Sequence, residues 1–255
     1  MLRRGLLLAA YGLPIASSAE STPHSAGIGG VTSSLPPLHP GQQPVALDVS
    51  VHWRSTLRFL LFLPRGYEAT TALWPVMFFL HGSGERGSDI EKLKLQGPPQ
   101  LSDRNPDFPF VLVSPQLDED TVWNPHDLHA LLGELQKRLR IDPERVVVTG
   151  LSLGGGGTWS WAAHYPNDIA AAVPVAGYGE DDHAVRMKSV PVRAYHGSAD
   201  TVVPILEHRR MVDALRSAGG QVDFIVFPGV GHDAWNRAYA DPELLPWMLA
   251  QRRRR

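Results

Sequence analysis

The segment Arg145-Val146-Val147-Val148-Thr149-Gly150-Leu151-Ser152-Leu153-Gly154 decides the fold of this 255-residue chain. Its first half is rich in valine, which is typical of a buried strand, and a helical pattern follows at 153–164. Ser152 therefore stands on a strand-to-helix turn. Its neighbours Gly150 and Gly154 are small, as a serine on such a sharp, strained turn requires. The segment predicts Ser152 as a nucleophile at the carboxyl end of a strand, near the positive pole of a helix.

The rest of the chain repeats this order of strand and helix. Continuously apolar runs indicate parallel strands buried on both faces, and helical stretches lie between them at 126–139, 153–164 and 205–217, with a last helix at 242–249. This repetition predicts an α/β fold with a mostly parallel central sheet, right-handed crossovers and helices on both faces. The first two runs are expected to form an antiparallel pair. The runs of strand length are 45–53, 57–63, 76–80, 110–113, 146–149, 170–175, 192–195 and 222–227.

A serine nucleophile needs a base, and histidine is the usual one. Five histidines follow Ser152, but only His232 lies in a glycine-flanked loop directly after the last strand. The base in turn needs a carboxylate. Where the serine lies on such a strand-to-helix turn, the order along the chain is serine, carboxylate, histidine. Asp200 follows a buried strand and so emerges at the same edge of the sheet as Ser152. The alternatives are a helix-capping loop histidine for His232 and a helix N-cap for Asp200.

Four segments of the chain, at 80–87, 150–159, 196–204 and 231–235, resemble the α/β-hydrolase superfamily. They are similar to small serine esterases grouped with phospholipase/carboxylesterases, dienelactone hydrolases and secreted predicted peptidases or feruloyl-esterase-like proteins. The resemblance covers about residues 45–249 and implies an α/β-hydrolase fold. It also implies an oxyanion hole made by the backbone N–H groups of Ser83 and Leu153. Glu85 and Arg86 either brace the Ser83 loop as an ion pair or are simply exposed.

Three further side chains are candidates to line the substrate cleft. Gln116 and Trp123 follow the strand that starts near residue 110, and Trp235 comes three residues after His232. The alternative for all three is packing in the core. Only residues 178–190 fill the connection in which lipases of this fold commonly carry a helical lid. We therefore expect no large lid and an open cleft.

Composition excludes several other classes of protein. The formal net charge is −2, so no broad basic surface is available for nucleic acid. The chain has no cysteine, which excludes a disulfide framework, thiolate metal sites and a cysteine nucleophile. His126 and His129 have the spacing H-x-x-H, but no partner carboxylate motif accompanies them. We expect neither a metal nor a cofactor.

The N-terminus indicates export. Arg3 and Arg4 precede a short apolar run, and small residues follow at 16–19, as in a signal peptide. The run is too short for stable membrane insertion, which needs ~20 residues. We expect a signal peptide at 1–19, a flexible leader at 20–44, a catalytic domain at 45–251 and a frayed basic tail at 252–255. The location would be secreted or periplasmic, and the alternative is an amphipathic or disordered cytosolic N-terminus.

These patterns together predict an exported serine hydrolase. It would cleave carboxylic esters with short acyl or aromatic groups, on small molecules or on polymers, through an acyl-enzyme on Ser152. A serine peptidase or amidase uses the same three residues and is the second interpretation. A noncatalytic binding protein on a hydrolase scaffold is the third, because fold alone does not determine function.

Overall fold

The computed structural model describes residues 39–50 and 54–253. The predicted signal peptide, residues 20–38 of the predicted leader, and Arg254 and Arg255 lie outside the described residues. In the part of the chain that is described, no helix has the length and apolar character needed to cross a membrane.

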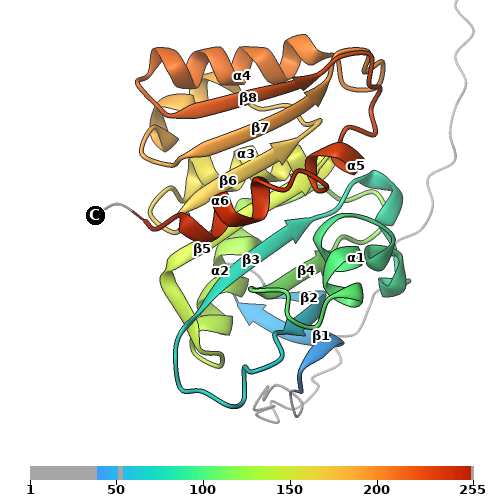
Figure 1. Ribbon diagram of the computed structural model, residues 1–255, viewed down its shortest axis with the longest axis vertical. Coiled ribbons are helices and arrows are strands. Elements are labelled where there is room, and N and C mark those ends of the chain that lie inside the picture. The colour runs from blue at the N-terminus through green and yellow to red at the C-terminus, as the bar shows by residue number, and fades with distance from the viewer. Residues whose placement is uncertain (1–38, 51–53, 254–255) are drawn as a thin grey trace, which may run out of the picture. The chain divides into compact units, whose positions relative to one another are not determined.

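One eight-stranded sheet, in the order β1-β2-β4-β3-β5-β6-β7-β8, organises the described residues (Figure 1). β1 pairs antiparallel with β2, and β2 pairs antiparallel with β4, while every pairing from β4 to β8 is parallel. This confirms the predicted mostly parallel sheet and its antiparallel first pair. The strands are β1 (Gly41–Ser50), β2 (Arg54–Leu63), β3 (Trp74–Leu80), β4 (Val111–Gln116), β5 (Ile141–Leu151), β6 (Ala171–Val175), β7 (Val192–Gly197) and β8 (Val222–Phe227).

Helices cover both faces of the sheet, and alternate residues of each strand face opposite cores. On β5, Val146 and Val148 join the core beneath α2, α3 and α4, whereas Val147 joins the core beneath α5 and α6. Figure 1 shows α5 and α6 in front of the sheet and α2 and α3 behind it. The helices are α1 (Gly97–Arg104), α2 (Pro125–Gln136), α3 (Leu153–His164), α4 (Ile205–Ser217), α5 (Trp235–Ala238) and α6 (Leu244–Ala250), with 3-10 turns η1 (Ser83–Glu85), η2 (Ile90–Leu95) and η3 (Asp181–Met187).

The connection between β6 and β7 contains only η3, a seven-residue 3-10 segment. The prediction of an α/β-hydrolase fold without a large lid is therefore confirmed for the described residues. The carboxyl ends of the parallel strands form one edge of the sheet, and this is the edge at which ligands bind in open α/β sheets.

Both ends of the catalytic domain differ from expectation. β1 begins at Gly41, inside the expected leader, because residues 41–44 pair with β2 in the register Gly41↔Leu63 to Pro44↔Leu60. A proline is tolerated there because β1 is an edge strand. The start of the basic tail is docked rather than frayed. Arg252 forms ion pairs with Asp142 and Glu144 of β5.

Candidate active site

Ser152 occupies the turn between β5 and α3 in a backbone conformation that is rare for any residue other than glycine. Its φ is 52° and its ψ is −117°. A hydrogen bond stabilises this turn: the Ser152 N–H donates to the carbonyl of Val175 on the neighbouring strand, at 2.9 Å. A Cβ atom on Gly154 would lie 1.8 Å from the carbonyl oxygen of Leu80, so only glycine lets α3 approach β3 this closely. Such strain persists only where the surroundings over-determine it, and it is common at reactive sites.

The structure brings Ser152, His232 and Asp200 into one hydrogen-bonded line. The hydroxyl Oγ of Ser152 lies 2.8 Å from Nε2 of His232, and Nδ1 of the same ring lies 2.7 Å from Oδ2 of Asp200. The three residues come from the ends of three different strands, β5, β7 and β8. A carboxylate accepts only, so Nδ1 of His232 carries the proton and Nε2 is free to accept the serine proton.

Asp200 is built to remain ionised although it is buried. Burial works to raise the pKa of this carboxyl, but hydrogen bonds from His232 and from the backbone N–H groups of Val203 and Val202 outweigh it and hold the pKa below its ordinary value. The two N–H groups donate to Oδ1 at 3.0 and 2.9 Å, which leaves Oδ2 for His232. An ionised Asp200 can stabilise a positive charge on the His232 ring.

The loop after β3, residues 81–89, forms the other wall of the site, and we call it the oxyanion loop. Gly82 lies against Ser152, since a Cβ added there would be 3.5 Å from Cβ of Ser152. Ser83 then starts η1, and Leu153 starts α3. N–H groups in the first turn of a helix have no partner within that helix. Both residues expected to supply oxyanion donors therefore begin a helical turn beside Ser152.

His81 braces the oxyanion loop from inside the protein. Its Nδ1 lies 2.6 Å from the Gly82 carbonyl, and its Nε2 accepts a hydrogen bond from the Leu117 N–H at 3.0 Å. The carbonyl requires a proton on Nδ1 and the N–H requires a lone pair on Nε2, so the ring is neutral. Burial lowers the pKa of His81 to about 4, against 6.5 for an ordinary histidine.

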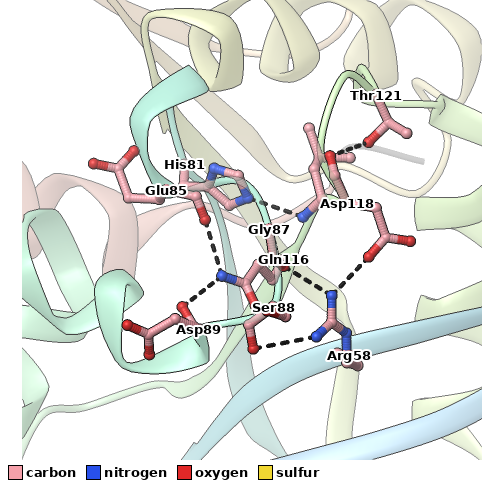
Figure 2. Close-up of polar contacts among 10 residues, drawn as sticks. Arg58, His81, Glu85, Gly87, Ser88, Asp89, Gln116, Asp118 and Thr121 are labelled. Atoms are coloured by element: carbon pink, nitrogen blue, oxygen red, sulfur yellow. Dashed lines mark hydrogen bonds and ion pairs between the residues drawn. The ribbon is translucent and has the colours of Figure 1, made fainter.

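Gln116 also braces this loop, and its predicted place in the substrate cleft is wrong. Its side chain is 5% exposed, and Nε2 donates to the carbonyls of Glu85 at 2.9 Å and Asp89 at 2.7 Å. Figure 2 shows this amide between the two carbonyls, with the Arg58 guanidinium donating to the carbonyls of Gly87 and Ser88, which lie between Glu85 and Asp89 in the loop. Gln116 ends β4 and points into the loop rather than into open space.

Glu85 matches neither of the two expectations for it. Its side chain is buried, and Oε1 accepts a hydrogen bond from Nε2 of Gln96 at 3.0 Å. Burial raises the pKa of this carboxyl. Among the described residues no ion pair joins it to Arg86, so Glu85 serves as a buried anchor of the oxyanion loop.

Comparison with known proteins places this arrangement in a family. The model of the dienelactone hydrolase family matches residues 107–243, a little over half of the chain, and that range contains Ser152, Asp200 and His232. The chain belongs to the dienelactone hydrolase family. Membership indicates a hydrolase and agrees with the α/β-hydrolase fold described above.

This dienelactone hydrolase family member aligns with most of the length of some relatives and with less than half of others. A protein of Escherichia coli strain K12 is 28% identical over 259 residues, which cover 89% of this chain and 84% of the relative. One of Methylorubrum extorquens is 35% identical over 118 residues, 42% of this chain and 40% of the relative. Both carry the provisional name carboxymethylenebutenolidase. A crystal structure of a thermostable esterase has a TM-score of 0.71 and 26% identity, and covers 82% of this chain, which spans 63% of that esterase.

A cavity of about 200 Å³ runs along α3 in this dienelactone hydrolase family member, starting at Leu153, the residue after Ser152. Trp123, predicted to line the cleft, forms part of its wall, and its indole N–H also donates to the His81 carbonyl at 3.1 Å. Trp123 therefore lines this cavity and also packs in the core, while its contact with substrate stays a prediction. The lining is Val122, Trp123, Leu153, Gly156, Gly157, Trp159, Ser160, Ala163, Tyr178, Gly179, Glu180, His183 and Met211.

Trp235, the third side chain predicted to line the cleft, packs against His232. Its ring stands edge to face with the His232 ring, with centroids 5.2 Å apart. Its side chain is half-buried and also joins the core beneath α5 and α6. The two histidines of the H-x-x-H spacing have separate partners, since His126 contacts the Tyr165 hydroxyl and His129 the Asp168 carboxylate.

His196 and His208 lie on the core side of Asp200, and the sequence predicted no functional role for either. Both are fully buried, and Nε2 of His196 lies 3.2 Å from Oδ2 of Asp200. His196 directly precedes a glycine in the segment that contains Asp200, and this proximity was the available signal. His208 lies on α4, where the sequence indicated only a helix.

Proposed function

We propose that this protein hydrolyses carboxylic esters through an acyl-enzyme on Ser152. The observation that carries the proposal is the line from Ser152 Oγ to His232 Nε2 and from His232 Nδ1 to Asp200, at 2.8 and 2.7 Å. This is the geometry in which a neutral imidazole can take a serine proton while a carboxylate stabilises the resulting imidazolium.

The reaction follows from these contacts. Ser152 Oγ attacks the ester carbonyl carbon as its proton moves to His232 Nε2, and the carbonyl oxygen becomes an oxyanion. The N–H groups of Ser83 and Leu153 would donate to it, and losing one such donor typically costs ~10²- to 10³-fold in rate. The proton on His232 then passes to the leaving alkoxide. A water, deprotonated by the same ring, attacks the acyl-enzyme and releases the carboxylic acid and free Ser152.

The surroundings of Ser152 favour short acyl or aromatic groups. The cavity beside Leu153 holds about 200 Å³ and has the Trp123 and Trp159 rings in its wall. That volume suits a short chain or a single ring, and flat aromatic walls suit a ring best. With only η3 between β6 and β7, no lid stands ready to cover a long chain.

Acetate, butyrate, benzoate and palmitate esters of one phenol, with the matched amides, test this proposal. The expected result is rapid turnover of the first three esters, slow turnover of palmitate without a jump above its micellar threshold, and slow cleavage of amides. Fastest turnover of palmitate would contradict the open cleft. Amides cleaved as fast as esters would instead favour a peptidase.

A matched pair of glycine variants tests the role of the cavity. Gly156 lines it, and a Cβ there would lie 3.4 Å from the Tyr178 carbonyl oxygen, whereas a Cβ on Gly133 of α2 would meet nothing within 4 Å. Gly156→Ala should lower kcat/KM for the benzoate ester about tenfold relative to acetate. Gly133→Ala should leave the ratio unchanged. Equal ratios in both variants would show that the cavity does not bind the substrate.

We also propose that the protein is exported, with cleavage after Ala19. The support is the pair Arg3 and Arg4, the short apolar run and the small residues before Ala19. N-terminal sequencing of the protein from its native host tests this. A mature chain that starts at Glu20 is expected, and an uncleaved chain in the cytoplasm would contradict it.

A further inference from the structure

A hydrogen-bonded pair of histidines, His196 and His208, lies directly behind the Asp200 carboxylate. Nε2 of His196 is 2.9 Å from the Val203 carbonyl and 3.2 Å from Asp200 Oδ2. Nδ1 of His196 is 2.8 Å from Nδ1 of His208. Both rings have no exposed surface. Asp200 therefore has one imidazole on each side, His232 toward the cleft and His196 toward the core.

The partners of these rings determine which nitrogens carry protons. The Val203 carbonyl and the Asp200 carboxylate accept only, so Nε2 of His196 must be an N–H that both share. A contact between two ring nitrogens needs one donor and one acceptor. His196 in its neutral form has no proton left for Nδ1, so His208 Nδ1–H is the donor. Burial keeps both rings neutral, because it lowers the pKa of His196 and, more strongly, that of His208.

His208 contributes little else that is polar. Its Nε2 is buried and has no hydrogen-bond partner among the described residues. Its ring packs edge to face on Trp159 and at a tilt on Phe224. An apolar side chain would fill this space without the desolvation penalty of an imidazole. The single polar contact of His208 is therefore the one to His196, and its effect is to hold the proton of His196 on Nε2.

We propose that His196 is a positioning residue for the proposed esterase reaction, and that His208 sets the tautomer through which it acts. The inference rests on the proposed function, since it assigns a role behind the Ser152, His232 and Asp200 line. His196 fixes the rotation of the Asp200 carboxylate, so that Oδ2 stays aligned with His232 Nδ1 when that ring becomes an imidazolium.

The neutrality of His196 matters for this role. A lysine or arginine at that position would also donate to Oδ2, but its positive charge would oppose the charge that forms on His232 during the reaction. A neutral N–H orients the carboxylate and leaves its negative charge available. The backbone N–H groups of Val202 and Val203 act on Oδ1 in the same way, so Asp200 is held through both oxygens by uncharged donors on the core side.

A matched pair of substitutions at residue 196 tests the proposal. Hydrogen bonds to charged groups are among the strongest in proteins, so His196→Leu should lower kcat about 10- to 100-fold with KM nearly unchanged. His196→Gln keeps an N–H near the position of Nε2 and should recover activity to within a few-fold of the unsubstituted protein. Equal losses in both variants would overturn the proposal.

A double-mutant cycle shows whether His196 acts through Asp200. Residues that act as a unit have non-additive effects. In an Asp200→Asn background, His196→Leu should change kcat less than twofold. A loss as large as in the unsubstituted background would mean that His196 supports only the fold, and would overturn the proposal.

Nitrogen-15 spectra of the histidine rings test the proton positions in the unsubstituted, full-length protein, even if a variant fails to fold. The expected tautomers are Nε2–H for His196 and Nδ1–H for His208. A charged His196 or a proton on its Nδ1 at pH 7 would overturn the assignment. Labelling of Ser152 by a fluorophosphonate in the same sample separates the outcomes, because unlabelled Ser152 contradicts the proposed function, whatever the tautomers are.

Discussion

The two walls beside Ser152 are organised in opposite ways. On the base wall, Asp200 and His232 contact each other through side chains, at 2.7 Å. On the oxyanion loop the side chains of His81 and Gln116 bind backbone groups, and in the proposed reaction the N–H groups of the backbone hold the oxyanion. A base needs a particular side chain, whereas an oxyanion hole needs a particular backbone shape. A base can therefore be recognised in the sequence by its residue type. An oxyanion hole can be recognised only through the side chains that hold the backbone in that shape.

Loss of Ser152, or of His232 on the base wall, should have the largest effect. Ser152→Ala removes covalent catalysis, and His232→Ala removes the base, so each should lower kcat by roughly 10⁴- to 10⁶-fold. Because the two act as one unit, the double variant should be no worse than the singles. Steady-state kinetics and circular dichroism check activity and folding. A folded Ser152→Ala variant that keeps a tenth of the activity would remove this serine from the mechanism.

Both walls depend on neutral buried histidines, and this makes stability depend on pH. The pKa of His81 is lowered from 6.5 to about 4, so its contribution is present above pH 6.5 and is lost as the pH falls toward 4, where the unfolded chain binds the proton first. For His81 alone the loss is on the order of 3 kcal/mol in the free energy of unfolding. His208 adds to it in the same direction.

Urea titrations between pH 8 and 4 measure this dependence on each wall separately. His81→Asn and His208→Leu should each show a shallower fall in the free energy of unfolding than the unsubstituted protein. If both variants keep the full slope, other groups carry the pH dependence and these histidines are not held neutral by the fold.

Loosening the oxyanion loop should have the smallest effect of the three. Gln116→Met keeps the volume and removes both hydrogen bonds to the loop, so kcat should fall about tenfold, less than for loss of a whole oxyanion donor. Gln42→Met is the matched control, because Gln42 donates in the same way to the Pro99 carbonyl of α1, outside the oxyanion loop. A similar loss in both variants would show that Gln116 acts on the fold in general.

The same contrast explains what was predictable from the sequence. Ser152, Asp200 and His232 each follow a strongly apolar strand, and Ser152 and His232 also have glycine neighbours, so parallel-sheet topology was enough to bring the three together. The sheet and its main helices followed from the same apolar runs.

What was missed depends on contacts that leave no local pattern. Gln116 was placed in the cleft because it ends a strand at the functional edge, but its amide turns to two carbonyls about thirty residues earlier in the chain. Helix α1 begins with Gly97, Pro98 and Pro99, a poor helix composition in which the prolines are tolerated only because they lie in the first turn. The role of His208 depends on the approach of α4 to β7, which helix periodicity does not reveal.

Covalent capture of Ser152 shows whether this serine is the nucleophile. The protein is treated with a fluorophosphonate, the modified peptide is located by mass spectrometry, and the rate of labelling is compared with that of His232→Ala. We expect one label per chain, on Ser152, formed much more slowly without His232 and blocked by a slowly hydrolysed aromatic ester. A folded, ester-hydrolysing protein that stays unlabelled at Ser152, or labels equally fast without His232, would contradict this expectation.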